Sequence, residues 1–150
     1  MAIRSEYVYD SKRKCYVGGV DLGSVKVGVS EDTLATEALV FMVVGLMGHW
    51  KQAIGYFLIN KISADTQAQL VQGAITLLND CGMHVRAVVC DGCNTNQATA
   101  RILGCNLDAN VVTNFFPNPV TGQKVYFLLD ACHLIKNVRN TLGDKKAIRR

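Results

Sequence analysis

Apolar residues fall along the chain in two kinds of spacing, which predict paired strands first and a mixture of helices and strands later. Residues 38–47 and 52–59 are two strongly apolar runs parted by a Gly-His-Trp-Lys segment, the pattern of adjacent antiparallel strands, and we expect both to be largely buried. Ahead of them, residues 2–9 and 15–18 flank a polar turn at 10–14 and predict a hairpin. Residues 19–36 show no sustained periodicity and are expected to form a long connection.

After residue 60 the spacing becomes helical and then alternates with short apolar strands. Ser63 is a suitable N-cap for a helix that ends near Gly82. The remaining pattern predicts a strand at 84–90, a helix at 97–103, a polar loop through residues 117–119, a strand at 124–129 and a closing helix with Leu134, Ile135, Val138 and Leu142 on one face. Strand-to-helix crossovers require parallel pairing. The fold class is therefore α/β, with a mixed sheet, antiparallel in its first strands and parallel in its later strands, flanked by helices.

Composition limits the kind of protein this is. A chain of 150 residues with 49% hydrophobic and 19% charged residues is typical of one globular domain. The longest apolar run, at 39–48, is about half of what a membrane-spanning helix needs, and the N-terminus offers no secretory signal. We therefore expect an intracellular protein, not a membrane protein, in which the six cysteines are reduced thiols.

The net charge of +4 is concentrated at the C-terminal end of the chain. Residues 133–150 contain six lysines and arginines against the single acid Asp144. Such an asymmetry suits a surface that faces phosphate, with Lys136 and Arg139 within reach of DNA, but it equally suits a solvated helix end. The sequence leaves both interpretations open.

Two acidic residues follow the two strands expected to be parallel. Asp91 comes directly after the strand at 84–90, and Asp130 after the strand at 124–129. Ligands of open α/β sheets gather beyond the carboxyl ends of the strands, where two carboxylates would attract a hard divalent cation. Each aspartate could instead cap the turn or helix that follows it. Spacing alone does not decide between these roles.

Cys90 and Cys93 have the C-x-x-C spacing of zinc and redox sites, and Cys132 with His133 would offer two more ligands. We favour a core cysteine at position 90, because it ends an apolar strand. Trp50 lies between His49 and Lys51, a context for stacking on a base, although a turn aromatic is the more usual role between two apolar strands.

Five segments together carry a resemblance to a known family. They are residues 1–6 (MAIRSE), 49–52 (HWKQ), 89–92 (VCDG), 115–119 (FFPNP) and 130–140 (DACHLIKNVRN). In this order they resemble the P element transposases and the relatives that carry a THAP zinc domain. The resemblance implies a ribonuclease-H-like core that cuts and joins DNA strands with Mg²⁺ or Mn²⁺ held by three acidic residues. Asp91 matches the second of these acids, a metal ligand. Asp130 and His133 match an Asp-x-x-His motif beside the active site.

The resemblance also implies partners and gaps. Transposon-end DNA would be the partner, in the nucleus, and the full-length protein would be a homo-oligomer. The family's first acid precedes the position of Met1, and its last acid follows an inserted GTP-binding domain. We therefore expect an incomplete core at 1–143, with 144–150 beginning a linker or that inserted domain, which does not cut DNA alone. A non-catalytic nucleic-acid-binding or interaction module derived from a transposase is the alternative, besides a small zinc or redox protein.

Overall fold

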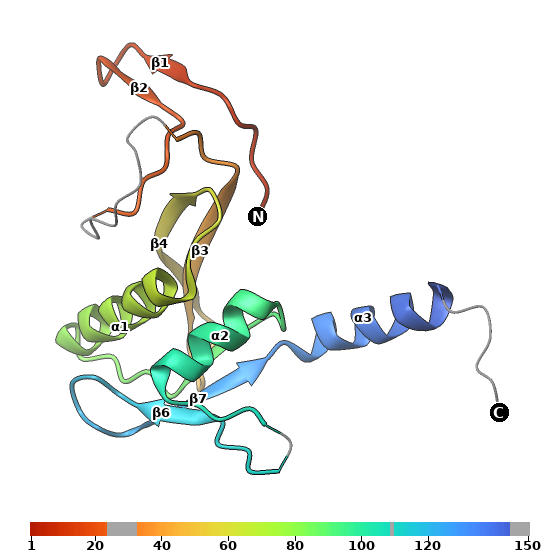
Figure 1. Cartoon of the computed structure of the whole chain (residues 1–150). Coiled ribbons are helices and arrows are strands. Elements are labelled where there is room, and N and C mark those ends of the chain that lie inside the picture. Colours follow the sequence, from red (N-terminus) through yellow and green to blue (C-terminus); the bar gives the residue numbers. More distant parts are fainter. Residues whose placement is uncertain (24–32, 109, 145–150) are drawn as a thin grey trace. The chain divides into compact units, whose positions relative to one another are not determined.

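The computed structural model describes residues 1–23, 33–108 and 110–144, whose helices and strands are traced in Figure 1. The chain divides into two compact units, Met1–Ile62 and Ser63–Arg150. Part of the expected connection at 19–36 lies outside the described residues, and so does nearly all of the segment at 144–150.

The first unit contains two antiparallel hairpins. β1 (Val8–Asp10) pairs with β2 (Cys15–Val17), and β3 (Glu37–Val44) pairs with β4 (Lys51–Ile59), as the apolar pattern predicts. β1 is shorter than the expected strand at 2–9, because the residues before it leave the hairpin and Ala2 bridges to the start of β3. Asp21 and Leu58 exchange backbone hydrogen bonds of 2.8 and 3.0 Å, so a described part of the 19–36 connection pairs with β4.

The prediction that β3 and β4 are both largely buried is wrong. Ala38 and Ile59 are buried, whereas Val40, Met42 and Val44 are exposed. The side chains of a strand alternate between the two faces of a sheet. An unbroken apolar run therefore places apolar groups on both faces, and the run itself does not show that both faces are covered.

The second unit begins with two helices that pack on each other. α1 (Ala64–Asp80) starts as predicted at Ser63, whose Oγ accepts a hydrogen bond of 3.1 Å from the Thr66 amide. α2 (Asn94–Leu103) begins three residues earlier than the predicted 97 and ends at Gly104, which has a left-handed φ of 113° that favours glycine. The Thr99 hydroxyl joins the two helices by donating to the carbonyl of Ala64 at 3.4 Å.

The same unit contains a three-stranded sheet in the order β5-β7-β6. β5 (Ala87–Cys90) runs parallel to the central β7 (Lys124–Leu129), and β6 (Phe115–Pro117) runs antiparallel to it. We expected a loop where β6 lies. Pro117 is tolerated there because β6 is an edge strand, where a missing N–H breaks no ladder. Phe116, Val125 and Phe127 form the buried side of this sheet.

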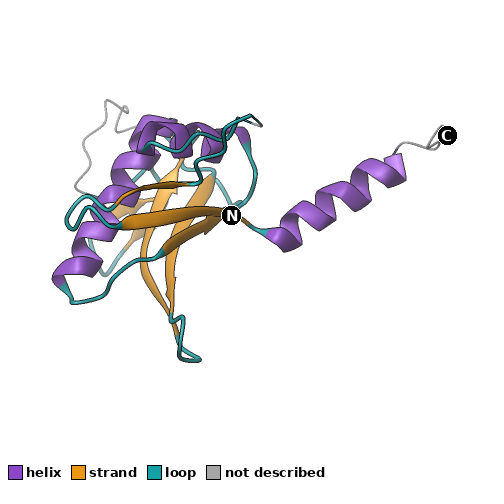
Figure 2. Ribbon diagram, turned by 90° about the horizontal axis from the view of Figure 1, so that it is seen from below, coloured by secondary structure: helices purple, strands orange, loops and turns teal. Residues whose placement is uncertain are grey.

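α3 (Ala131–Asp144) follows β7 directly and extends away from the rest of its unit (Figure 2). Its predicted apolar face is present, but it is exposed at Leu134, Ile135, Val138 and Leu142. Gly143, expected just behind the helix, lies inside it. None of the helices that the structure describes is both long and apolar enough to cross a bilayer.

Candidate active site at the carboxyl ends of the parallel strands

Parallel pairing brings Asp91 and Asp130 to the same edge of the sheet. Cys90 on β5 is the register partner of Leu129 on β7, so the two aspartates occupy the next, equivalent positions. The Asp130 amide donates a 2.8 Å hydrogen bond to the Cys90 carbonyl, which continues the ladder up to the acids. Neighbouring strands are about 4.8 Å apart. Two carboxylates therefore start side by side from one edge, at the place where the sequence predicts ligand binding.

The Asp91 carboxylate is fixed by a network that reaches two helices. Its Oδ1 accepts hydrogen bonds from the Cys93 amide at 3.1 Å and from Asn96 Nδ2 at 2.7 Å. Asn96 Oδ1 in turn accepts from Gln67 Nε2 on α1 at 2.5 Å. Both nitrogen donors that bond the Asp91 carboxylate therefore use the same oxygen, and the orientation of that carboxylate is set by packed helices.

The surroundings of Asp91 favour its charged form. The pKa of Asp91 lies below its ordinary value, mainly because the Cys93 amide and then the Cys93 thiol donate hydrogen bonds to it, with further contributions from Asn96 and from the positive charge of His133. His133 is half-buried in the first turn of α3. The structure thus places His133 within electrostatic reach of Asp91.

Asp130 has the same local geometry as Asp91. Its Oδ1 accepts a 2.9 Å hydrogen bond from the Cys132 amide, and its backbone carbonyl accepts from the Leu134 amide at 3.0 Å as α3 begins. Asp130 thus caps a helix, and this use of one carboxylate oxygen leaves the other for a cation. The capping role and a metal-binding role are compatible at both aspartates.

Carboxylate oxygens are the ligands that Mg²⁺ and Mn²⁺ prefer. Asp91 and Asp130 are ligands of the type that such a cation prefers, but two carboxylates are too few protein ligands to hold an ion tightly. Across residues 1–23, 33–108 and 110–144, no three or more histidine, cysteine, aspartate or glutamate side chains are grouped closely enough to hold a metal. The described site is therefore a partial ligand set.

The cysteines of the C-x-x-C segment are poorly suited to bind zinc or to act as redox-active thiols. Burial raises the pKa of the Cys90 thiol to about 12, helped by the negative charges of Asp91 and Cys93. Burial also raises the pKa of the Cys93 thiol. Thiolate is the form that binds metal and exchanges disulfides, so the structure favours the core-cysteine interpretation of Cys90.

Lys136 and Arg139 are both exposed on α3. The Arg139 guanidinium donates to the neighbouring Asn140 Oδ1 at 3.3 and 3.1 Å. His133 and Lys136 are three residues apart and share a face of the helix. A basic side chain thus follows the candidate site along the same helix.

Trp50 is not part of this site, because it belongs to the turn between β3 and β4. Its indole covers Gly45 and Gly48, where a Cβ at Gly48 would lie 3.0 Å from the ring and a Cβ at Gly45 would overlap it. This geometry agrees with a turn aromatic, although Trp50 is still 47% exposed.

Sequence reasoning missed Asn96 and Gln67. A signal was present for Asn96, because an amide five residues after a strand-end aspartate, in the first turn of the next helix, can reach back to the carboxylate. Gln67 carried no such signal, because its contact with Asn96 depends on how α1 packs on α2.

Three comparisons with known proteins agree with one another. The family model described as TNP-like, RNase H N-terminal domain matches residues 1–104. The human DNA transposase THAP9 is 32% identical over 149 residues, which are 99% of this chain and 16% of that protein. The Drosophila P element transposase strand transfer complex matches 96% of this chain and 28% of the solved chain, with a TM-score of 0.70 and 24% identity. The likeness confirms the ribonuclease-H-like fold class, and the chain spans less than a third of either relative.

Proposed function

The chain belongs to the transposase family whose RNase H-like N-terminal domain matches residues 1–104, and from that membership we propose that it takes part in metal-dependent cutting and joining of DNA strands. The observation that carries the proposal is the parallel register of β5 and β7, with Asp91 and Asp130 following directly at one edge. That edge is where α/β folds bind ligands. The three matched residues Asp91, Asp130 and His133 all lie there.

In this proposal Asp91 is the metal ligand among the described residues. Its lowered pKa keeps it charged, and the Asn96 contact holds its orientation. A divalent cation bound there would activate a water or 3′-hydroxyl and neutralise charge on the phosphate. Asp130 orients His133 or acts as an outer ligand, and His133 donates a hydrogen bond to the scissile phosphate. Within the described residues no third histidine, cysteine, aspartate or glutamate side chain is grouped with Asp91 and Asp130 closely enough to complete a metal site.

DNA is the proposed partner, and Lys136 with Arg139 are its proposed phosphate contacts. Both side chains are exposed on the helix that begins at the site, where a phosphate backbone would run past the two aspartates. Nuclear localisation and a homo-oligomeric full-length protein belong to the same proposal, since both come from the family resemblance.

A second candidate is a DNA-binding module of the same origin that cuts nothing. The observation in its favour is the partial ligand set, in which both aspartates already cap local structure. The two candidates differ in whether Asp91 matters for strand cleavage.

A chimera separates them. Residues 1–140 of this chain would replace the matching segment of THAP9, and excision of a transposon would be measured with and without Asp91→Asn. Asparagine keeps an oxygen for the Cys93 and Asn96 donors but loses the charge that a cation needs. We expect Asp91→Asn to abolish excision and the control Asp108→Asn, at an exposed position, to retain it. Equal excision by the two variants would remove the catalytic role of Asp91.

A further inference from the structure

The hairpin of β1 and β2 has one face made of tyrosines. Tyr9 and Tyr16 are register partners, with ring centroids 5.3 Å apart in an edge-to-face arrangement. Tyr7 precedes β1 by one residue and adds a third aromatic side chain to this end of the hairpin. All three are exposed, to 44% at Tyr7, 55% at Tyr9 and 72% at Tyr16.

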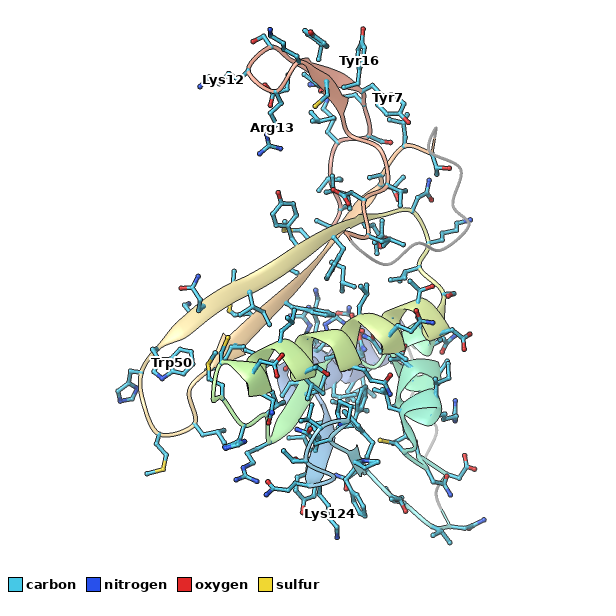
Figure 3. The ribbon with its side chains drawn as sticks, turned by 90° about the vertical axis from the view of Figure 1, so that its left-hand side faces the viewer. Tyr7, Lys12, Arg13, Tyr16, Trp50 and Lys124 are labelled. Carbon is cyan, nitrogen blue, oxygen red and sulfur yellow. The ribbon has the colours of Figure 1, made fainter. Side chains whose placement is uncertain are left out.

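The turn of the same hairpin consists largely of cations. Lys12, Arg13 and Lys14 follow one another in the turn that joins the strands and are exposed. The Arg13 guanidinium lies 3.8 Å from the Asp10 carboxylate. Asp10 Oδ1 also accepts hydrogen bonds from the backbone amides of Lys12 and Arg13. The Lys12 and Lys14 side chains form no ion pair or side-chain hydrogen bond within the described residues. Figure 3 shows Lys12 and Arg13 at the turn of the hairpin and Tyr16 pointing outward from its strand.

The hairpin is held in a defined shape. Gly18, just after β2, has a φ of 118°, and a Cβ there would collide with the carbonyl of Glu6. Glu6 is itself paired with Arg4 at 3.0 Å. Glu6 is therefore paired with Arg4 and Asp10 with Arg13, and neither acid forms an ion pair with Lys12 or Lys14.

We infer that this hairpin, defined by residues 7–17, binds a DNA strand with unpaired bases. Sequence-tolerant single-strand sites combine cations that contact the backbone with aromatic rings on which bases stack, and both groups are present here. Paired bases of a duplex do not offer their faces to a tyrosine, so the exposed rings favour the single strand. The choice of DNA rests on the proposed function, but the hairpin belongs to the first unit and Asp91 and Asp130 to the second. Strand binding by the hairpin requires no catalysis.

The test is a binding titration of the purified chain against a fluorescent single-stranded oligonucleotide and its duplex, at several salt concentrations. Lys12→Gln with Lys14→Gln removes the two unpaired cations, and Lys51→Gln with Lys61→Gln removes two exposed cations elsewhere in the same unit. We expect the first pair to weaken single-strand binding about tenfold near physiological salt and to lower the salt slope by about 1.4, at ~0.7 per phosphate contact. The control pair should change the slope much less.

Tyr16→Ala tests stacking separately. Loss of one stacked base should weaken single-strand binding by about fivefold to 150-fold. A separate double variant, Lys136→Gln with Arg139→Gln on α3, tests the phosphate contacts of the proposed function. Circular dichroism would show that each variant keeps its fold. Equal slopes for the two lysine pairs, unchanged binding by Tyr16→Ala, or a preference for duplex would each overturn the inference. An excision assay indifferent to Asp91→Asn would overturn only the proposed function.

Discussion

Removal of the Asn96 amide should both destabilise the second unit and release Asp91. In the structure, Asn96 Nδ2 donates to Asp91 Oδ1 at 2.7 Å and to its carbonyl at 3.2 Å, and Asn96 Oδ1 accepts from Gln67 at 2.5 Å. A hydrogen bond to a charged group contributes about 1.5–3 kcal/mol, and a buried donor left without a partner costs ~1–3 kcal/mol. Gln67 is buried. Because Asp91 is partly open to solvent, we expect Asn96→Ala to lower the free energy of unfolding by about 2–4 kcal/mol.

The sign of the pH dependence follows from the charge on Asp91. The pKa of Asp91 is lower in the folded chain, so its stabilising contribution is complete above the unfolded pKa of about 3.9 and is lost as the pH falls through the folded value. The cost of Asn96→Ala should therefore be larger at neutral pH than in acid. In the variant the pKa of Asp91 should rise toward its ordinary value.

Urea unfolding at neutral and acidic pH, with an NMR titration of the Asp91 carboxyl carbon, measures both effects. Asn94→Ala is the matched control, because Asn94 is exposed in the first turn of the same helix and makes no side-chain hydrogen bond within the described residues. If Asn96→Ala were no more destabilising than Asn94→Ala, or left the Asp91 titration unchanged, the network would not position this carboxylate.

Three further outcomes are expected. Binding of the chain to duplex DNA should be weak, steeply salt-dependent and indifferent to sequence. A salt titration against two unrelated duplexes measures this, and a strong preference for one duplex would contradict the prediction. Cys90 should react with iodoacetamide at pH 7.4 far more slowly than exposed Cys15, because burial raises its pKa to about 12; peptide mass mapping with equal rates would refute it. The chain alone should not cleave DNA with Mg²⁺ or Mn²⁺, because two ions at roughly 4 Å need more shared anionic ligands, and a gel assay that finds cleavage abolished by Asp91→Asn would show otherwise.

Apart from β6, sequence patterns predicted the order of the elements and the sheet edge that Asp91 and Asp130 share, because each of these elements carries its own local signal. Ser63 caps α1, Gly104 ends α2, and an acid follows each of two apolar strands. The exposure of β3 and β4 was not predictable, because an apolar run does not say which face is covered. β6 was missed because Phe115–Pro117 is too short for periodicity, and Pro117 there resembles a loop signal.

The candidate site was predicted only in part for a similar reason. Strand-end position identifies Asp91 and Asp130 from local sequence, and the family motif adds His133. The Gln67 contact depends on the packing of α1 on α2, which no spacing within one segment encodes. The tyrosines of the hairpin were visible in the sequence, but only the register of Tyr9 with Tyr16 shows that they share a face.

We propose that Asp91 and Asp130 form the cation-binding edge of this transposase-family domain, and NMR spectra recorded during a Mn²⁺ titration test this proposal. Paramagnetic broadening acts over short range and detects weak binding, so a partial ligand set is sufficient. We expect Mn²⁺ to broaden the amide signals of residues 91–93 and 130–133 first. Asp91→Asn should remove this broadening, and Asp108→Asn should not. Broadening centred elsewhere, or unchanged by Asp91→Asn, would contradict it.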